Sequence, residues 1–290
     1  MPHDIGSHGS GSHEAGAWNG ELDWSIVRQG QPRSGSREAA ITPSRPHGSV
    51  HEGSSPAPGL PGARPSEGDS SASRRQPERG DTARRVATRW AGSGSGERYG
   101  TQRFRSRRAR ERDPALLRSL LSGRPLPELP VLDAPSGAGR MRPTLFALSR
   151  PVVSLDVSDS MLGEVGSGGA GRIRGSALAL PFQDATFGLV VCCRLLHHLG
   201  VQEEREQLLA ELGRVSQRWV ALSYWDAASW HAWRRRRGWR HGHDRRVAMS
   251  AGLLEGIASK AGLRLVARRF SLRFVSPQSW ALFERVGTRP

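Results

Sequence analysis

The chain has few of the residues that would place it in several common classes of protein. Among its 290 residues there are two cysteines, adjacent at Cys192 and Cys193, and one lysine, Lys260. Two neighbouring cysteines cannot build a disulfide framework and lack any metal-binding spacing, so we expect neither a disulfide-rich secreted domain nor a metal site. A reducing, cytoplasmic setting is the simplest expectation.

Long apolar runs are missing from the first third of the sequence. Residues 1–95 are rich in Ser, Gly, Pro and Arg, and Ile26–Val27 is their longest run of large apolar residues. With so little to bury, such a segment does not offset the entropy lost on ordering. We therefore expect a disordered segment over residues 1–95, without signal peptide or membrane helix, and a folded domain over residues 96–290.

Acidic residues are scarce in that second part. The chain has a net charge of +16, yet residues 1–95 carry 11 basic and 10 acidic side chains, so the positive excess lies almost entirely in residues 96–290. Nearly all basic residues are arginines. A GC-rich coding sequence produces the same bias, so the charge by itself identifies no partner.

The folded part is organised around two apolar runs that each end in an acid. The first run ends at Asp133 and is followed by Gly137-Ala138-Gly139, and the second ends at Asp156. This order is typical of a strand, a glycine turn, a helix and a parallel strand, with the ligand at the carboxyl ends of the strands. Glycines let the backbone approach a ligand, and the second acid suits two ribose hydroxyls. The pattern predicts a nucleoside-containing cofactor.

Details of this stretch indicate which nucleoside. The dinucleotide fingerprint has a third glycine where this chain has Arg142, which disfavours NAD. Asp133, directly before the loop, suits a cationic aminoacyl group better than a pyrophosphate. The stretch resembles the first motif of the class I S-adenosylmethionine (SAM)-dependent methyltransferases, in the broad type 11 group, with Pro135 replacing the first glycine of their Gly-x-Gly-x-Gly loop.

Three further segments resemble the next motifs of that family, in the family's order and spacing: Leu155–Leu162, Gly175–Phe182 and Gln183–Val191. The resemblance covers about Gly96 to Val286. It implies a SAM-dependent methyltransferase with a Rossmann-like, doubly wound, mostly parallel α/β sheet and an antiparallel edge.

The alternation of apolar runs and helical patterns agrees with a parallel sheet covered on both faces. Helices are predicted over Asp113–Gly123, with Asp113 as N-cap, over Glu203–Gln217, and after the N-cap Ser250. Besides the strand at Val131, strands are predicted at Val152–Val157, Phe187–Cys193, Trp219–Tyr224, Leu263–Val266 and Trp280–Phe283.

The resemblance implies how SAM is held. Gly137 and Gly139 pass close to its methionine part, with Asp133 near the amino group. Asp156 accepts hydrogen bonds from the ribose hydroxyls, and Met161 packs on the adenine. The full set of expected cofactor-binding residues is Asp133, Gly137, Gly139, Asp156, Met161, Ser176 and Ala177.

Three positions depart from the family pattern. Ser176 stands where the family has an aspartate that accepts from the adenine amino group, and Gly188 replaces an aspartate after the fourth strand's first residue. With Pro135, these departures keep open a second hypothesis, a SAM-binding scaffold without turnover.

Methyl transfer mostly requires alignment, because the sulfonium already activates the methyl group. A base is needed only where the acceptor must lose a proton. His198, next to His197 after the fourth strand, is the candidate base. The alternative is that both histidines are simply residues at the start of a helix, where this family commonly has them. Arg194 is the candidate partner for an acidic acceptor.

The region least like the family is Tyr224–Arg246, where Trp225, Trp230, Trp233 and Trp239 surround Arg234–Arg237. It is interpreted as a packed lid, as a site for an anionic small molecule or lipid, or as a nucleic-acid surface. The leading function is methyl transfer to a small-molecule or lipid-like acceptor, with an RNA methyltransferase as the alternative. The oligomeric state is not predicted.

Overall fold

The computed structural model describes residue 88 and residues 106–166, 169–237 and 246–287. The disorder expected over residues 1–95 lies outside the described residues, as does the boundary placed at residue 96. Trp239 is outside them too; it belongs to the region Tyr224–Arg246, which we call the Trp/Arg segment. These expectations therefore stay predictions.

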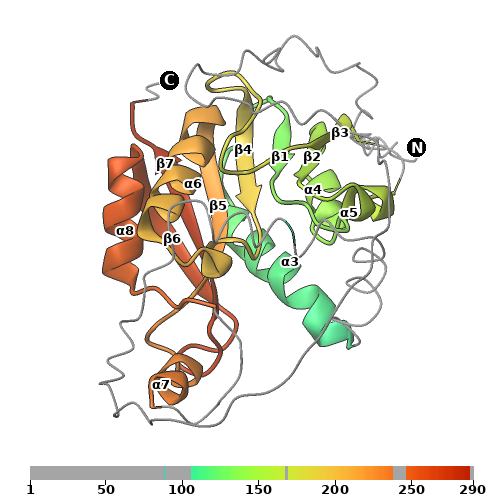
Figure 1. Cartoon of the computed structure of the whole chain (residues 1–290). Coiled ribbons are helices and arrows are strands. Elements are labelled where there is room, and N and C mark those ends of the chain that lie inside the picture. The colour runs from blue at the N-terminus through green and yellow to red at the C-terminus, as the bar shows by residue number, and fades with distance from the viewer. Residues whose placement is uncertain (1–87, 89–105, 167–168, 238–245, 288–290) are drawn as a thin grey trace, which may run out of the picture. The chain divides into compact units, whose positions relative to one another are not determined.

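A seven-stranded mixed sheet forms the centre of the domain (Figure 1), in the order β3-β2-β1-β4-β5-β7-β6. Strands β1 to β5 pair in parallel, whereas β7 runs antiparallel between β5 and β6. The mostly parallel sheet with an antiparallel edge is thus confirmed. The strands are β1 Val131–Asp133, β2 Val152–Asp156, β3 Gly171–Arg174, β4 Phe187–Cys192, β5 Ser216–Trp225, β6 Leu263–Phe270 and β7 Gln278–Arg285.

The central strands are apolar on both faces because each face is covered. All residues of β2 and β4 are buried, as expected for parallel strands between two layers of helices. One face packs on α6 and α8 and the other on α3 and α4, each with its own apolar core. The helices are α3 Arg107–Leu121, α4 Arg142–Phe146, α5 Asp159–Glu164, the short 3-10 helix η2 Leu196–His198, α6 Gln202–Val215, α7 Trp230–Arg236 and α8 Ala251–Lys260.

The predicted start of the first long helix is wrong. Helix α3 begins at Arg107, and its N-cap is Ser106, whose hydroxyl accepts from the Ala109 N–H at 3.2 Å. Asp113 lies inside the helix and is fully buried, because its carboxyl group serves tertiary partners instead of the helix end. The predicted end is confirmed, with Gly123 at φ +70°.

The other predicted elements are found with shifted ends. Ser250 caps α8, as expected, by accepting from the Leu253 N–H at 3.2 Å. The pattern that predicted a helix up to residue 217 in fact contains the start of β5 at Ser216. Strand β3 was not located from the sequence, since it has only four residues and two of them are arginines.

Candidate active site

The glycine loop after β1 is tied to the acid that ends β2. Gly137 and Gly139 have φ of +53° and +75°, a region that L side chains rarely adopt. The Gly137 N–H donates to Asp156 Oδ2 at 2.9 Å. Among the described residues, no heavy atom lies within 4 Å of the place a Cβ at Gly137 would take. The loop therefore leaves open space at the carboxyl edge of the sheet.

Asp156 is a buried acceptor with capacity to spare. Its Oδ1 accepts from the Ser158 N–H at 3.0 Å, and the residue is only 5% exposed. Burial raises the pKa of this carboxyl group, against the lowering effect of the backbone N–H groups of Ser158 and Gly137. A carboxylate offers about four acceptor positions, so this group can bind the further donors that a ribose presents.

Asp133, at the end of β1, is fully buried, and neither of its carboxyl oxygens has a hydrogen-bond partner among the described residues. Burial raises its pKa to about 8, while the nearby Arg140 acts in the opposite direction. A buried carboxyl group without a partner is costly. An ammonium group beside it would supply both the missing hydrogen bonds and a compensating charge.

The predicted adenine side is apolar. Met161, 3% exposed, and Ala177, 5% exposed, are buried. The hydroxyl of Ser176 accepts from the Leu178 N–H at 3.2 Å. One of its two lone pairs is thus used locally, and the other remains for a ligand donor.

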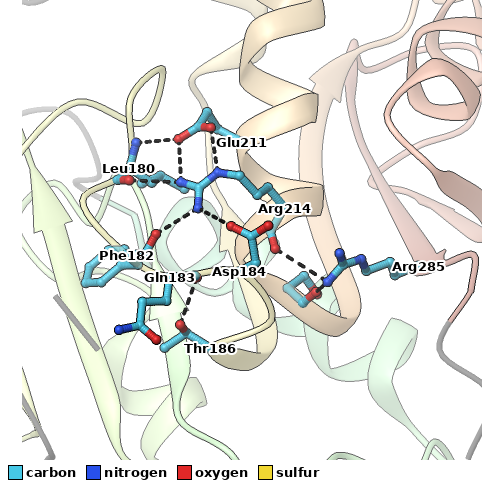
Figure 2. Close-up of polar contacts among 9 residues, drawn as sticks. Leu180, Phe182, Gln183, Asp184, Thr186, Glu211, Arg214 and Arg285 are labelled. Carbon is cyan, nitrogen blue, oxygen red and sulfur yellow. Dashed lines mark hydrogen bonds and ion pairs between the residues drawn. The ribbon is translucent and has the colours of Figure 1, made fainter. Parts of the chain in front are cut away.

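The loop that follows Ser176 is fixed by Arg214 from the end of α6 (Figure 2). Its Nη1 donates to the Phe182 carbonyl at 2.7 Å and to Asp184 Oδ1 at 2.9 Å. Its Nη2 donates to the Leu180 carbonyl at 2.9 Å, and Glu211 binds the same guanidinium. Glu211 and Asp184 also raise the pKa of Arg214, so it stays charged. The loop is therefore held in place by the protein's own contacts.

A second buried acid lies at the same edge, and the sequence did not single it out as a site residue. Asp113 on α3 accepts from Arg140 Nη2 at 2.6 Å and from Arg194 Nε at 2.9 Å, both through Oδ2, and from Trp280 Nε1 at 2.9 Å through Oδ1. Burial alone would raise its pKa, but Arg194, Arg140 and Trp280 together lower it. We refer to these four residues as the Asp113 cluster. The three partners are 27, 81 and 167 positions away from Asp113, so no local pattern reveals the cluster.

Arg194 lies just past β4, as expected, but the structure pairs it inside the protein. Its φ is +64°, and its backbone N–H donates to Ser223 Oγ at 2.7 Å. Because Asp113 compensates its charge, Arg194 is held in place before any acceptor binds. Its role towards an acidic acceptor stays a prediction.

The two histidines of η2 differ in their surroundings. His197 is 1% exposed and stacks on Trp225, with ring centroids 5.0 Å apart and an interplanar angle of 15°. The ring of His198 lies 4.5 Å from that of His197 and is partly exposed. Of the pair, His198 is the residue better placed to meet an acceptor, and its role as base stays a prediction.

Trp225, the last residue of β5, forms an aromatic wall beside these histidines. The guanidinium carbon of Arg246 lies 4.6 Å from its ring centroid, and that of Arg235 lies 5.5 Å away. The chain returns to the sheet at Met249, whose N–H donates to the Trp225 carbonyl at 2.8 Å and whose carbonyl accepts from the Ala227 N–H at 2.9 Å. The Trp/Arg segment is thus closed at its base by backbone hydrogen bonds.

Other kinds of site find no support within the described residues. No group of three His, Cys, Asp or Glu side chains there could hold a metal ion. Burial raises the pKa of the Cys192 thiol, and it raises that of Cys193 to about 12, so neither is a ready nucleophile. No helix in this part of the chain has the length and apolar composition that crossing a membrane requires.

Comparisons with known proteins agree with the fold and the motifs. The sequence model of a methyltransferase domain family matches residues 132–218. A "Putative methyltransferase" of Encephalitozoon cuniculi is 37% identical over 86 residues, which are 29% of this chain and 39% of that protein. The match therefore spans less than half the length of this curated relative.

Two solved structures share the fold. Magnesium protoporphyrin IX methyltransferase from Synechocystis PCC 6803, with bound SAH, is 20% identical with a TM-score of 0.55, over 71% of this chain and 100% of that one. A SAM-dependent methyltransferase from Leishmania major is 13% identical with a TM-score of 0.55, over 70% and 82% of the two chains. The chain thus resembles the class I SAM-dependent methyltransferases in its fold, and residues 132–218 match the sequence model of a methyltransferase domain.

Proposed function

We propose that this protein transfers a methyl group from SAM to a small-molecule or lipid-like acceptor. The observation that carries the proposal is Asp133, a fully buried carboxyl group without a partner among the described residues. It lies beside an open glycine loop and ends the strand next to that of Asp156. Asp133 suits the ammonium group of an amino acid, the open glycine loop suits the aliphatic part next to it, and Asp156 suits a ribose.

The residues around this position have separable tasks. Asp133 would bind the ammonium of SAM, the Gly137 loop would let its methionine part approach the backbone, and Asp156 would accept from the ribose. Met161 and Ala177 would form the apolar wall against the adenine. SAM supplies the activated methyl group, so the protein's own contribution is to align the donor with the acceptor and exclude water.

On the acceptor side, the structure offers an aromatic wall with positive charge. Trp225, His197 and the partly exposed His198 lie at the ends of β4 and β5, with Arg246 over the Trp225 ring. The two arginines over Trp225 and the partly exposed ring of His198 suit an acceptor that carries an anionic group. His198 would take up a proton where the acceptor loses one. The Synechocystis enzyme, which shares this fold, is named for magnesium protoporphyrin IX, a small organic molecule.

An RNA acceptor is less well supported. Exposed aromatic faces are what stack on bases, but the faces of Trp225 lie against His197 and the two arginines described above. The chain also has Cys-Cys-Arg-Leu at the end of β4, where amino-methylating RNA enzymes carry Asn-Pro-Pro-Tyr-like residues.

We further propose that the methyltransferase domain extends over residues 96–290.

The proposal is tested by calorimetry with SAM and with its demethylated product, S-adenosylhomocysteine. Wild type should bind both, and Asp133→Asn should bind both much more weakly. Asp159→Ala is the control, because it removes an acid from the neighbouring Leu155–Leu162 motif whose side chain is 68% exposed and pairs with Arg174. Tight binding of NAD, with no response to SAM, would overturn the proposal.

Turnover is tested separately by tracing label from methyl-labelled SAM into a small-molecule extract and into total RNA. Label in an extractable organic molecule supports the proposed acceptor class. Label in RNA would replace it with the alternative. Binding of SAM without transfer to either would favour a scaffold.

A further inference from the structure

Large apolar side chains are exposed on two segments that meet beyond the carboxyl end of β5. In the turn between β6 and β7, Leu272, Phe274 and Val275 are 60%, 59% and 58% exposed, and Trp230, which begins α7, is 51% exposed. The Trp230 N–H donates to the Phe274 carbonyl, so the two segments form one surface. Contiguous exposed apolar groups of this kind mark interaction sites on soluble domains.

Positive charge surrounds these apolar groups. Neither α7 nor the turn contains an acidic residue, and Arg234, Arg237 and Arg273 are exposed. The guanidinium carbon of Arg273 lies 4.8 Å from the ring centroid of Phe274, and that of Arg237 lies 4.4 Å from Trp233. We call this surface the α7–turn patch: Trp230, Leu272, Phe274 and Val275 with Arg234, Arg237 and Arg273.

The patch has the chemistry of a protein surface that enters the head-group layer of an anionic bilayer. Aromatic and aliphatic side chains enter the boundary between head groups and acyl chains. Arginines beside them bury their stems and keep the guanidinium groups at the level of the lipid phosphates. Arg273 beside Phe274 is such a pair on the turn.

Other occupants fit less well. Trp230 stacks on Trp233 with centroids 4.4 Å apart and an interplanar angle of 21°, and Arg237 lies over Trp233, so these rings already have partners that bases would have to displace. Leu272 and Val275 are aliphatic and have no stacking face. A second copy of the chain would bring its own arginines against the same patch, and like charges repel.

We propose that the α7–turn patch docks the protein on an anionic lipid surface. Strand β7 starts at Gln278, paired with Trp225 at the end of β5, so the patch lies at the end of the sheet where the proposed acceptor binds. Docking would turn that end of the domain towards the membrane. The idea that the acceptor is taken from this membrane rests on the proposed function. Docking itself requires neither SAM nor turnover.

The test is co-sedimentation of the full chain with vesicles of phosphatidylcholine, alone or mixed with phosphatidylglycerol. Wild type should bind the mixed vesicles, and binding should fall as salt rises, since exposed charges are screened. Leu272→Ser with Phe274→Ser should lower the partition coefficient about ten-fold or more. Arg237→Gln with Arg273→Gln should lower it on the order of five-fold per arginine.

Two control variants match these changes elsewhere on the domain. Val286→Ser replaces an apolar residue that is 63% exposed at the opposite end of β7. Arg174→Gln with Arg264→Gln removes two positive charges from exposed side chains on β3 and β6. Both controls should bind the vesicles like wild type. All variants should keep wild-type binding of S-adenosylhomocysteine, so a failure of docking and a failure of the proposed function are distinguishable.

Several results would overturn the proposal. Equal binding to neutral and mixed vesicles, or equal losses in test and control variants, would exclude a specific anionic interface. Absence of vesicle binding, together with single-stranded RNA binding that the arginine variants weaken, would assign the patch to nucleic acid. A concentration-dependent dimer that Phe274→Ser dissociates, without vesicle binding, would assign it to a second copy.

Discussion

Two fully buried aspartates lie at the same end of this sheet, and their surroundings are opposite. Asp113 receives hydrogen bonds from two arginines and a tryptophan, and its pKa is lowered. Asp133 has no hydrogen-bond partner among the described residues, and its pKa is raised to about 8. The contrast distinguishes an acid with a structural role from an acid that is available to a ligand. The saturated acid, Asp113, fastens α3 to the sheet, whereas the unsaturated one, Asp133, would be completed by the SAM ammonium under the proposed function.

The largest expected effect is the loss of stability on replacing the saturated acid, Asp113. Asp113→Ala would remove the carboxylate between Arg140 and Arg194, whose side chains are only 15% and 17% exposed, and should cost about 3–5 kcal/mol of unfolding free energy. Urea denaturation measures it. Asp184→Ala, a 56% exposed partner of Arg214, is the control and should cost about 1 kcal/mol or less. Similar small losses in both variants would mean that the Asp113 cluster does not fasten α3.

For the unsaturated acid the expected effect is on binding. Asp133→Asn removes the charge that would compensate the SAM ammonium, and it should weaken S-adenosylhomocysteine binding by about 2–5 kcal/mol. The same change should stabilise the free protein at pH 8, because no acid remains to be buried. Calorimetry and thermal unfolding measure the two effects. A variant that binds normally would remove Asp133 from the site.

The two acids also predict opposite responses to pH. The pKa of Asp133 rises from 3.8 to about 8 on folding, so between about pH 4 and pH 8 the folded state holds a proton that the unfolded state has lost. This group's contribution to stability therefore falls as pH rises through that window. The lowered pKa of Asp113 has the reverse effect, since its contribution is present above the unfolded pKa and is lost in acid.

The free energy of unfolding of wild type and Asp133→Asn, measured across this pH range, tests the direction of the change. Wild type should become less stable between about pH 4 and pH 8, and the variant should not show this decrease. Binding of the cationic cofactor should strengthen with pH over the same range, by up to about ten-fold per unit, because it requires the ionised carboxylate. A flat pH profile of affinity would contradict a contact between Asp133 and an ammonium group.

A smaller effect is expected at Asp156, which is intermediate between the two. It already accepts from the Gly137 and Ser158 N–H groups, and it would gain ribose hydroxyls. Asp156→Ala should weaken S-adenosylhomocysteine binding by ten-fold or more, roughly 1.5–3 kcal/mol in total. Ser158→Ala, which keeps the backbone donors, is the control and should bind nearly normally.

The sequence predicted the parts of this molecule that are local. The strand ends at Asp133 and Asp156 and the helix cap at Ser250 follow from short-range patterns. It misplaced the start of α3, because an acid before a proline looks like an N-cap until its tertiary partners are known. The sequence also could not show that Arg194 meets Asp113, since they are 81 positions apart and no rule of spacing connects them.

The closed base of the Trp/Arg segment has a consequence for how such proteins diversify. Because Trp225, Ala227 and Met249 are joined by backbone hydrogen bonds, the base of this segment is closed without any contribution from the side chains between them. The entropic cost of closing a longer segment grows only slowly with its length. A segment of another length could therefore replace this one at small entropic cost, and under the proposed function it would change the acceptor while the residues that would hold SAM stay in place.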